Sequence, residues 1–158
     1  TRCGDIDATI LPYIMEKTGK TAKEMDTIMN KESGLLGISG VSSDSRDIEN
    51  GIKEGNKRCE LAQKMYVRRI VDYIAKYYAE LEGCDGIVFT AGVGENSVST
   101  RKQVMEALKV FGVELDEEKN NIRGALQKIS TNESAIPVYV IPTDEEVMIA
   151  RDTYNLAK

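Results

Sequence analysis

The sequence predicts an α/β fold with parallel strands flanked by long helices, and three observations carry this prediction. Residues 86–91 and 138–141 are short apolar runs rich in β-branched residues, which is typical of buried parallel strands. Each run is followed by a turn and then by a helical pattern, as in an α/β repeat. The third observation is an amphipathic stretch over 56–82, which is long enough for a helix that covers a sheet.

The first half of the chain is predicted to be helical. Apolar residues recur at helical spacing over 5–32, and Gly19 separates this stretch into two pieces. The Gly- and Ser-rich residues 33–43 are predicted to form a loop. A short helix is expected over 44–54, and its cap is predicted to be Asp44 or the serine before it.

The helix over 56–82 has the clearest pattern in the chain, and Gly83 is expected to end it. Its apolar face is predicted to consist of Leu61, Met65, Ile70, Ile74, Tyr77 and Leu81. If this face exceeds what the chain's own core covers, it would serve oligomerisation, which is one alternative function for the chain.

The second half alternates between strands and helices. After the first apolar run, residues 98–111 are predicted to form a helix that stops at Gly112. Residues 113–115 are expected to form a short edge strand, and the charged residues 116–128 to be partly helical. The final helix is predicted to open at Thr143, after the second apolar run.

Two strands alone form a poor parallel sheet, because parallel strands need neighbours on both edges and cover on both faces. We therefore expect early strands of the sheet to be missing from this sequence, which begins with Thr1 rather than Met. The linker-like stretch 33–43 is too short to establish a domain boundary, and 158 residues suffice for one domain with a core.

Composition argues against several classes of protein. The net charge of −5 disfavours a nucleic-acid binder, and no apolar run is long enough to cross a bilayer. The chain has no histidine, which excludes catalytic triads within it and most zinc sites. Cys3, Cys59 and Cys84 lack metal-ligand spacing and favour a reducing, cytoplasmic setting.

The segment Gly92–Asn96, with sequence GVGEN, follows the first predicted strand and precedes a helix. Ligands of open α/β sheets bind beyond the carboxyl ends of the strands, where backbone N–H groups can face an anion. The segment is not a dinucleotide fingerprint, because Ser97 stands where a third glycine is required. An ordinary glycine turn without a ligand accounts for the spacing equally well.

Three further motifs each have a plain structural interpretation. TGKT over 18–21 is not a phosphate loop, because Ile14 stands where its first glycine is required and no strand precedes it. In PTDEE, Thr143 and Glu146 are predicted to form a capping box, which leaves Glu145 free to bind Mg²⁺. SDSRD over 43–47 reads as a capped helix start with solvated charges, or as an arginine fork that contacts a nucleotide.

Four segments in this order resemble the C-terminal part of the acetate/propionate kinase family: TRCGDID, SGLLGISGVSSDSRD, GIVFTAGVGENS and IPTDEEVMIARDT. The match runs from Thr1 to about Thr153. It implies an actin-like, two-domain phosphotransferase of the sugar-kinase and heat-shock ATPase superfamily, with ribonuclease H-like cores. Residues 1–158 would then be the later part of the second, nucleotide-binding domain, and the first domain would be absent.

The resemblance also implies roles for individual residues. Arg2 matches an arginine that stabilises the transition state of phosphoryl transfer, and Glu145 matches a magnesium-binding carboxylate. The positions implied for ATP are Asp44, Ser45, Arg46, Gly92, Val93, Gly94, Glu95 and Asn96. Cys3 and Ala8 depart from the serine and proline that relatives often carry, and neither change falls on an implied contact.

The implied reaction is the reversible, ATP- and Mg²⁺-dependent conversion of acetate to acetyl phosphate by a cytoplasmic enzyme, expected to be a homodimer at full length. The substrates are small molecules, and neither nucleic acid nor a membrane is expected as a partner. The chain alone is expected to be inactive, because the acetate pocket and the catalytic aspartate of the family lie upstream of its motifs. Propionate kinase, a non-catalytic nucleotide-binding protein and an oligomerisation module remain the alternatives.

Overall fold

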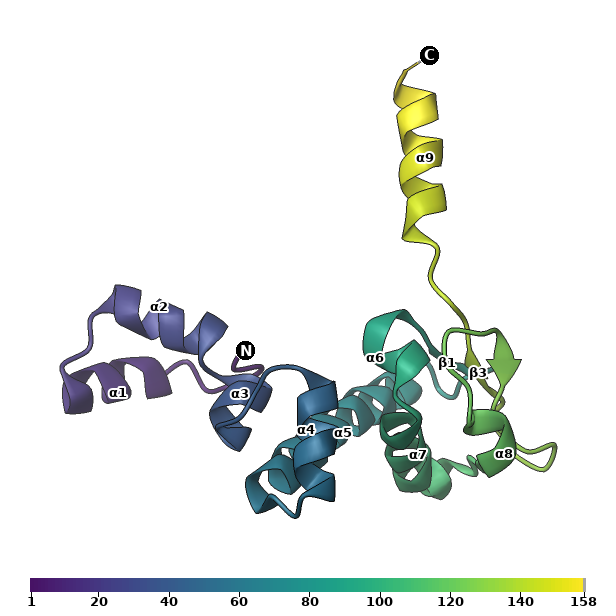
Figure 1. Cartoon of the computed structure of the whole chain (residues 1–158), viewed down its shortest axis with the longest axis horizontal. Helices are drawn as coiled ribbons and strands as arrows, with labels where there is room; N and C mark the ends of the chain where they lie inside the picture. Colours follow the sequence, from purple (N-terminus) through teal and green to yellow (C-terminus); the bar gives the residue numbers. More distant parts are fainter. Residues whose placement is uncertain (158) are drawn as a thin grey trace. The chain divides into compact units, whose positions relative to one another are not determined.

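A computed structural model describes residues 1–157 of the chain (Figure 1). The polypeptide divides into two compact units, Thr1–Arg69 and Ile70–Lys158, and the boundary falls within the longest helix. The first unit is built from helices, and the second contains the sheet. The described part of the chain has no helix that is both long and apolar enough to span a membrane.

The first unit begins with two short helices, α1 (Ile10–Thr18) and α2 (Ala22–Lys31), which contact each other. The predicted break at Gly19 is confirmed: Gly19 has φ of 69° and ends α1 in the left-handed region that favours glycine. Thr21 then starts α2 with a capping box, in which its hydroxyl accepts from Glu24 N and the Glu24 carboxylate accepts from Thr21 N.

The loop predicted over 33–43 is partly wrong, because residues Gly34–Ser39 form helix α3. The segment is held by Arg58, which donates from Nε to Ile38 O (2.8 Å) and from Nη2 to Gly37 O (3.1 Å). These bonds satisfy carbonyls at the C-terminal end of the short helix, so a tertiary contact stabilises a helix that local propensity does not favour. The helix α4 (Ser45–Lys53) follows and is capped by Asp44, which is one of the two predicted caps.

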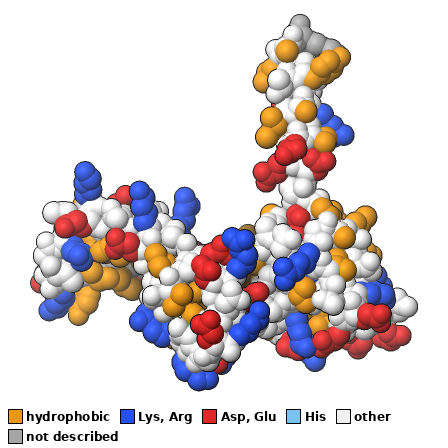
Figure 2. All heavy atoms as spheres, viewed as in Figure 1, with side chains coloured by type: hydrophobic (Ala, Val, Ile, Leu, Met, Phe, Trp, Pro, Cys, Tyr) orange, Lys and Arg blue, Asp and Glu red, His pale blue; other side chains and the backbone are white. Residues whose placement is uncertain are grey.

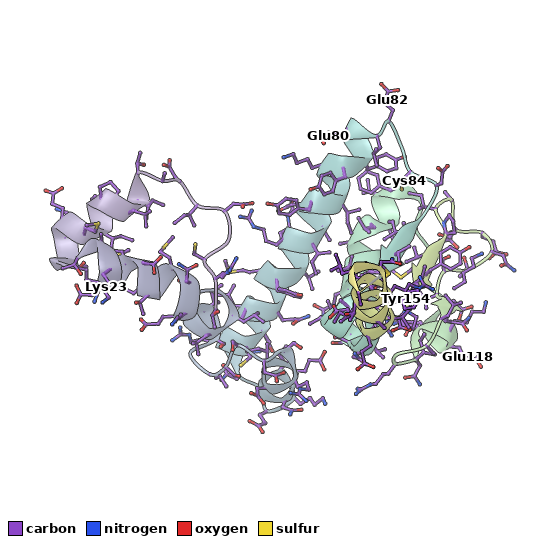
Figure 3. All side chains as sticks on the ribbon, turned by 90° about the horizontal axis from the view of Figure 1, so that it is seen from above. Lys23, Glu80, Glu82, Cys84, Glu118 and Tyr154 are labelled. Carbon is purple, nitrogen blue, oxygen red and sulfur yellow. The ribbon has the colours of Figure 1, made fainter. Side chains whose placement is uncertain are left out.

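The helix α5 (Lys57–Glu80) confirms the long helix predicted over 56–82, but most residues of its predicted apolar face do not enter the core. Leu61, Met65, Tyr77 and Leu81 are exposed. The buried side instead carries smaller residues, namely Cys59, Ala62, Gln63, Val67 and Val71. The helix ends through Glu82 in the left-handed region (φ 56°) rather than through Gly83 alone, and Figure 3 labels Glu82 at this end.

The second unit contains a three-stranded sheet in the order β1-β3-β2. Strands β1 (Ile87–Phe89) and β3 (Val138–Val140) are parallel, with Phe89 opposite Val140, which confirms the predicted pair. Strand β2 (Gln127–Lys128) is antiparallel to β3. The predicted edge strand over 113–115 is reduced to a single bridge between Leu115 and Ser130.

Five helical segments accompany this sheet. They are α6 (Ala91–Asn96), α7 (Val98–Ala107), the 3₁₀ helix η1 (Leu108–Phe111), α8 (Glu117–Asn120) and α9 (Glu145–Leu156). Gly112 ends η1 with φ of 77°, as predicted. The core beneath them consists of Val104, Met105, Leu108, Val113, Ile129, Val138 and Val140, none of which is more than 1% exposed. Helix α9 contributes no buried residue.

Candidate functional site

The carboxyl end of β1 leads directly into the segment predicted to hold nucleotide. Thr90 is extended, Ala91 adopts φ of 58°, and the chain then coils into α6. A left-handed alanine costs about 1–2 kcal/mol, so surrounding contacts must stabilise this turn. The prediction that this segment only precedes a helix is therefore corrected: residues 92–96 lie within the short helix α6, which begins at a sharp turn.

The two glycines of α6 differ in their surroundings. A β-carbon added at Gly94 would lie 3.3 Å from Phe89 C, so this glycine allows α6 to pack closely against the end of β1. A β-carbon added at Gly92 would meet no atom within 4 Å. Gly92 therefore presents backbone to open space, which leaves room for a ligand to approach the chain closely.

Arg101 supports this turn by hydrogen bonds to its backbone, a role that the sequence did not predict. The side chain is fully buried, with 0% exposure, and donates from Nη1 to the carbonyls of Gly94 (2.9 Å) and Glu95 (2.8 Å). Its Nε and Nη2 donate to Oδ1 and O of Asn120 (both 2.8 Å), and Nη2 also donates to Ile122 O (2.7 Å). Burial lowers the pKa of Arg101, but an arginine stays protonated, so five acceptors surround a fixed positive charge.

Glu95 connects α6 to the segment before α9. Its Oε1 accepts from Thr143 N (2.8 Å) and from Thr143 Oγ1 (3.0 Å). The bond from the Thr143 backbone is the main reason why the pKa of Glu95 lies below its ordinary value. Thr143 Oγ1 also accepts from Ala91 N (3.1 Å) and lies 2.8 Å from Thr90 Oγ1.

The capping box predicted for Thr143 and Glu146 is wrong, because the Thr143 hydroxyl is engaged by α6. Asp144 caps α9 instead, with Oδ1 accepting from Val147 N (3.0 Å). Glu145 is the first residue of α9 and is exposed. Figure 2 shows acidic side chains gathered at this end of the helix.

The described residues contain no group of three or more His, Cys, Asp or Glu side chains placed to hold a metal ion. A single exposed carboxylate such as Glu145 nevertheless fits Mg²⁺, which keeps several waters and takes few protein ligands. A phosphate group bound beside Glu145 would complete such a site.

In the first unit, Asp44, Ser45 and Arg46 lie at the start of α4. Asp44 accepts from Arg46 N (2.8 Å), and its Oδ2 lies 2.6 Å from Arg46 Nη2. The side-chain bond from Arg46 is the largest cause of the lowered pKa of Asp44, which is about 2. The Arg46 side chain is 84% exposed, so one edge of its guanidinium is bound while its planar faces are open.

Arg2 is exposed, while the backbone around it is fixed by α2 and α3. Ser33 N donates to Thr1 O (2.8 Å), and Cys3 N donates to Met29 O (2.9 Å). A β-carbon on Gly34 would lie only 2.7 Å from Arg2 O, and Gly34 has φ of 63°. Sequence reasoning missed Gly34, although a glycine at a helix start is a signal of such a close approach.

The predicted site residues thus fall into groups by unit. In the second unit, Gly92–Asn96 and Glu145 lie at the same edge of the sheet, because β1 and β3 are parallel and Thr143 is bonded to Glu95. In the first unit, Asp44, Ser45 and Arg46 form one exposed helix start, and Arg2 lies beside α3. The sequence did not indicate Arg101 or Gly34 as supporting residues, and it assigned Thr143 to the cap of the last helix rather than to Glu95.

Comparisons with known proteins identify the family of this chain. The model of the acetokinase family matches residues 1–151. An acetate kinase from Treponema denticola is 53% identical over 158 residues, which cover 100% of this chain and 40% of that protein.

Solved structures of an acetate kinase and a propionate kinase also superpose on this chain. The acetate kinase of Porphyromonas gingivalis superposes with a TM-score of 0.92 at 46% identity, covering 100% of this chain and 40% of that one. A propionate kinase from Francisella tularensis superposes with a TM-score of 0.88 at 35% identity, covering 95% of this chain and 38% of that one. The chain therefore spans about 40% of the length of the relatives that it matches. It belongs to the acetokinase family.

Proposed function

We propose that this chain is the nucleotide- and magnesium-binding part of an acetate kinase, which transfers a phosphoryl group reversibly between ATP and acetate. The observation that carries this proposal is the shared edge of the sheet, where Gly92 exposes its backbone and Glu145 starts α9. In open α/β folds this edge is where ligands bind. Membership in the acetokinase family gives the class of reaction.

Each group of residues has a proposed part in holding the nucleotide. In the second unit, the backbone of Gly92–Asn96 is proposed to lie against ATP. In the first unit, the open faces of Arg46 are proposed to stack on or bond to a nucleoside, with Asp44 and Ser45 fixing the position of Arg46. Glu145 would hold Mg²⁺, which supplies neutralisation of the phosphate charge.

Phosphoryl transfer requires alignment and charge neutralisation more than covalent chemistry by the protein. Arg2 would neutralise charge that develops on the transferring phosphoryl group, and its fixed backbone limits where the side chain can reach. The chain alone is proposed to lack turnover, because it spans only about 40% of the length of the relatives that it matches. The full-length enzyme is proposed to be a cytoplasmic homodimer that acts on small molecules.

Titration with ADP and Mg²⁺ tests the proposal. We expect the chain to bind ADP more tightly with Mg²⁺ than without, and Glu145→Ala to remove this difference. Gly94→Val should weaken binding with or without the metal, because a side chain there would push α6 away from Phe89. Unchanged affinity in both variants would contradict the proposed site, and acetyl phosphate formation by the chain alone would contradict its inactivity.

Propionate kinase is the second candidate, favoured by the structural likeness to the Francisella tularensis enzyme. One methylene changes binding by about 1–3 kcal/mol, so the preference between the two acids is expected to be modest. The ratio of kcat/KM for acetate and propionate, measured on the full-length enzyme, distinguishes them.

An oligomerisation role is favoured by exposed apolar residues in α5 and directly after it, namely Leu61, Met65, Tyr73, Tyr77 and Leu81. Monomeric behaviour of the chain in size-exclusion chromatography would contradict this role.

A further inference from the structure

We infer that Glu95 is a positioning residue: its carboxylate fixes the segment before α9 and thereby sets where Glu145 lies relative to the glycines of α6. This inference rests on the proposed function and deepens it. It concerns the Glu95 carboxylate alone, which is bonded to Thr143; the backbone of Glu95 stays part of the segment proposed to lie against ATP.

The first step is the direction of the carboxylate. One oxygen, Oε1, accepts from both the N–H and the hydroxyl of Thr143, at 2.8 and 3.0 Å. A carboxylate that accepts a backbone N–H makes a charge-assisted bond, which is stronger than a neutral one. A Glu95 carboxylate turned toward the phosphates of a nucleotide would instead place like charges near one another.

The second step is the hydrogen bonding of the Thr143 hydroxyl. A hydroxyl has one proton to donate and two lone pairs with which to accept. The proton goes to Glu95, and one lone pair accepts from Ala91 N. The 2.8 Å contact with Thr90 then has Thr90 Oγ1 as its donor, so the hydroxyl is fully used by residues at the start of α6.

The third step is the distance from this contact to the metal ligand. Glu145 follows Thr143 by two residues, and two residues of extended chain span at most about 7 Å. Fixing the backbone N–H of Thr143 therefore restricts the position of the Glu145 backbone. Asp144 restricts it further by capping α9 at its first turn.

The fourth step is the anchor on the other side of Glu95. The Glu95 carbonyl accepts from the buried guanidinium of Arg101, so the residue is bonded at its backbone to the core and at its side chain to Thr143. Because Glu95 is bonded at both its backbone and its side chain, it couples the position of Thr143 to the core. The network therefore runs from Arg101 through Glu95 to Thr143, and it ends two residues from Glu145.

The experiment compares ADP affinity with and without Mg²⁺ in the 158-residue chain. Loss of a residue that orients a metal ligand typically weakens metal binding by about 10- to 100-fold. We expect Glu95→Ala to reduce the Mg²⁺-dependent gain in ADP affinity at least tenfold, while affinity without Mg²⁺ stays close to wild type. Glu95→Gln keeps an acceptor oxygen and should restore most of the gain.

The chain supplies a matched control. Glu114 also accepts from a threonine hydroxyl, Thr131 Oγ1 at 3.1 Å, and it is exposed. Glu114→Ala should leave the Mg²⁺-dependent gain unchanged. Thr143→Val should reproduce part of the Glu95→Ala effect, and the double variant should lose less than the sum of the two. The Thr143 amide resonance reports the contact directly and should move upfield in Glu95→Ala.

The outcomes separate this inference from the proposed function. A wild-type gain that Glu145→Gln abolishes and Glu95→Ala leaves intact would overturn the positioning role alone. An equal loss of ADP affinity with and without Mg²⁺ in Glu95→Ala would also overturn it, because Glu95 would then contact nucleotide itself. If wild-type affinity for ADP does not depend on Mg²⁺, both the proposed function and this inference fail.

Discussion

Arg101 and Arg46 are both arginines near the start of a helix, yet their surroundings are opposite. Arg101 is fully buried and donates to four carbonyls and one side-chain amide. Arg46 is exposed and paired at one edge with Asp44, so the rest of its guanidinium faces solvent. The same type of side chain therefore acts as an internal support in the second unit and is exposed for contact with a ligand in the first.

The comparison predicts that replacing Arg101 has the largest effect. Arg101→Met would remove the guanidinium donor from Gly94 O, Asn120 Oδ1 and Ile122 O, while Glu95 O and Asn120 O each keep a backbone donor; each unsatisfied group costs about 1–3 kcal/mol. We therefore expect a loss of about 3 kcal/mol or more in the free energy of unfolding, measured by urea denaturation. Arg101→Lys should recover only part of this, because an ammonium cannot reach all five acceptors. A loss below about 1 kcal/mol in Arg101→Met would show that water replaces the guanidinium.

The second prediction concerns the support of Arg2. Gly34→Ala places a methyl 2.7 Å from Arg2 O at a left-handed position, so the backbone at Arg2 must move. We expect a loss of about 1–2 kcal/mol in stability from the combined strain and clash. The resonances of Thr1–Cys3 should shift with it. Gly19→Ala is the control: Gly19 is also left-handed, but a β-carbon there would meet no atom within 4 Å, so this variant measures the cost of the backbone conformation alone.

The third prediction tests Arg46 as a ligand contact. Arg46→Ala should weaken ADP binding about tenfold, the loss of roughly 1.4 kcal/mol expected for one stacked or forked contact. Stability should change by less than about 0.5 kcal/mol, because exposed ion pairs contribute little. Arg46→Lys should not restore binding, since a lysine lacks the planar fork. A large loss of stability with unchanged ADP binding would contradict this prediction and show that Arg46, like Arg101, is a structural support.

Sequence patterns predicted the two parallel strands, the break at Gly19 and the cap at Asp44, because these depend on neighbours in the chain. They failed for Arg101, since an arginine within a helical pattern reads as a solvated charge until the carbonyls around it are known. They failed for Thr143 because a local cap at Glu146 competed with Glu95, which lies 48 positions away in the sequence and provides a charged acceptor. Tertiary partners, rather than propensity, decided both cases.

The apolar face of α5 shows the same limit in another form. The predicted apolar face places Leu61, Met65 and Tyr77 together, but at about 100° per residue Tyr77 lies nearly opposite Leu61 around α5. Spacing alone does not say which side of a helix the rest of the chain covers. Small residues such as Ala62 allow close packing, and they mark the buried side of this helix.

The smallest predicted effect is the titration of Asp44. Its pKa of about 2 is depressed chiefly by the side-chain bond from Arg46 and next by the bond from Arg46 N. A depressed carboxyl pKa means that the stabilising interaction is fully present above the ordinary value and is lost as pH falls through about 2. The carboxyl carbon of Asp44, followed by NMR, should therefore remain that of an ionised group at a pH near 3.

Arg46→Ala and high salt each test the cause of the low Asp44 pKa, and the response to salt also distinguishes Arg46 from Arg101. Arg46→Ala removes the larger cause, so the midpoint should move toward the ordinary value while the backbone cap remains. High salt should move the midpoint in the same direction, because both side chains are exposed to solvent and the pair is screened. The guanidinium of Arg101 is buried and bonds to carbonyl and amide oxygens, so the stability lost in Arg101→Met should depend little on salt. A wild-type titration midpoint near the ordinary pKa of aspartate would mean that Arg46 does not pair with Asp44 in solution. The whole guanidinium of Arg46 would then be available to a ligand.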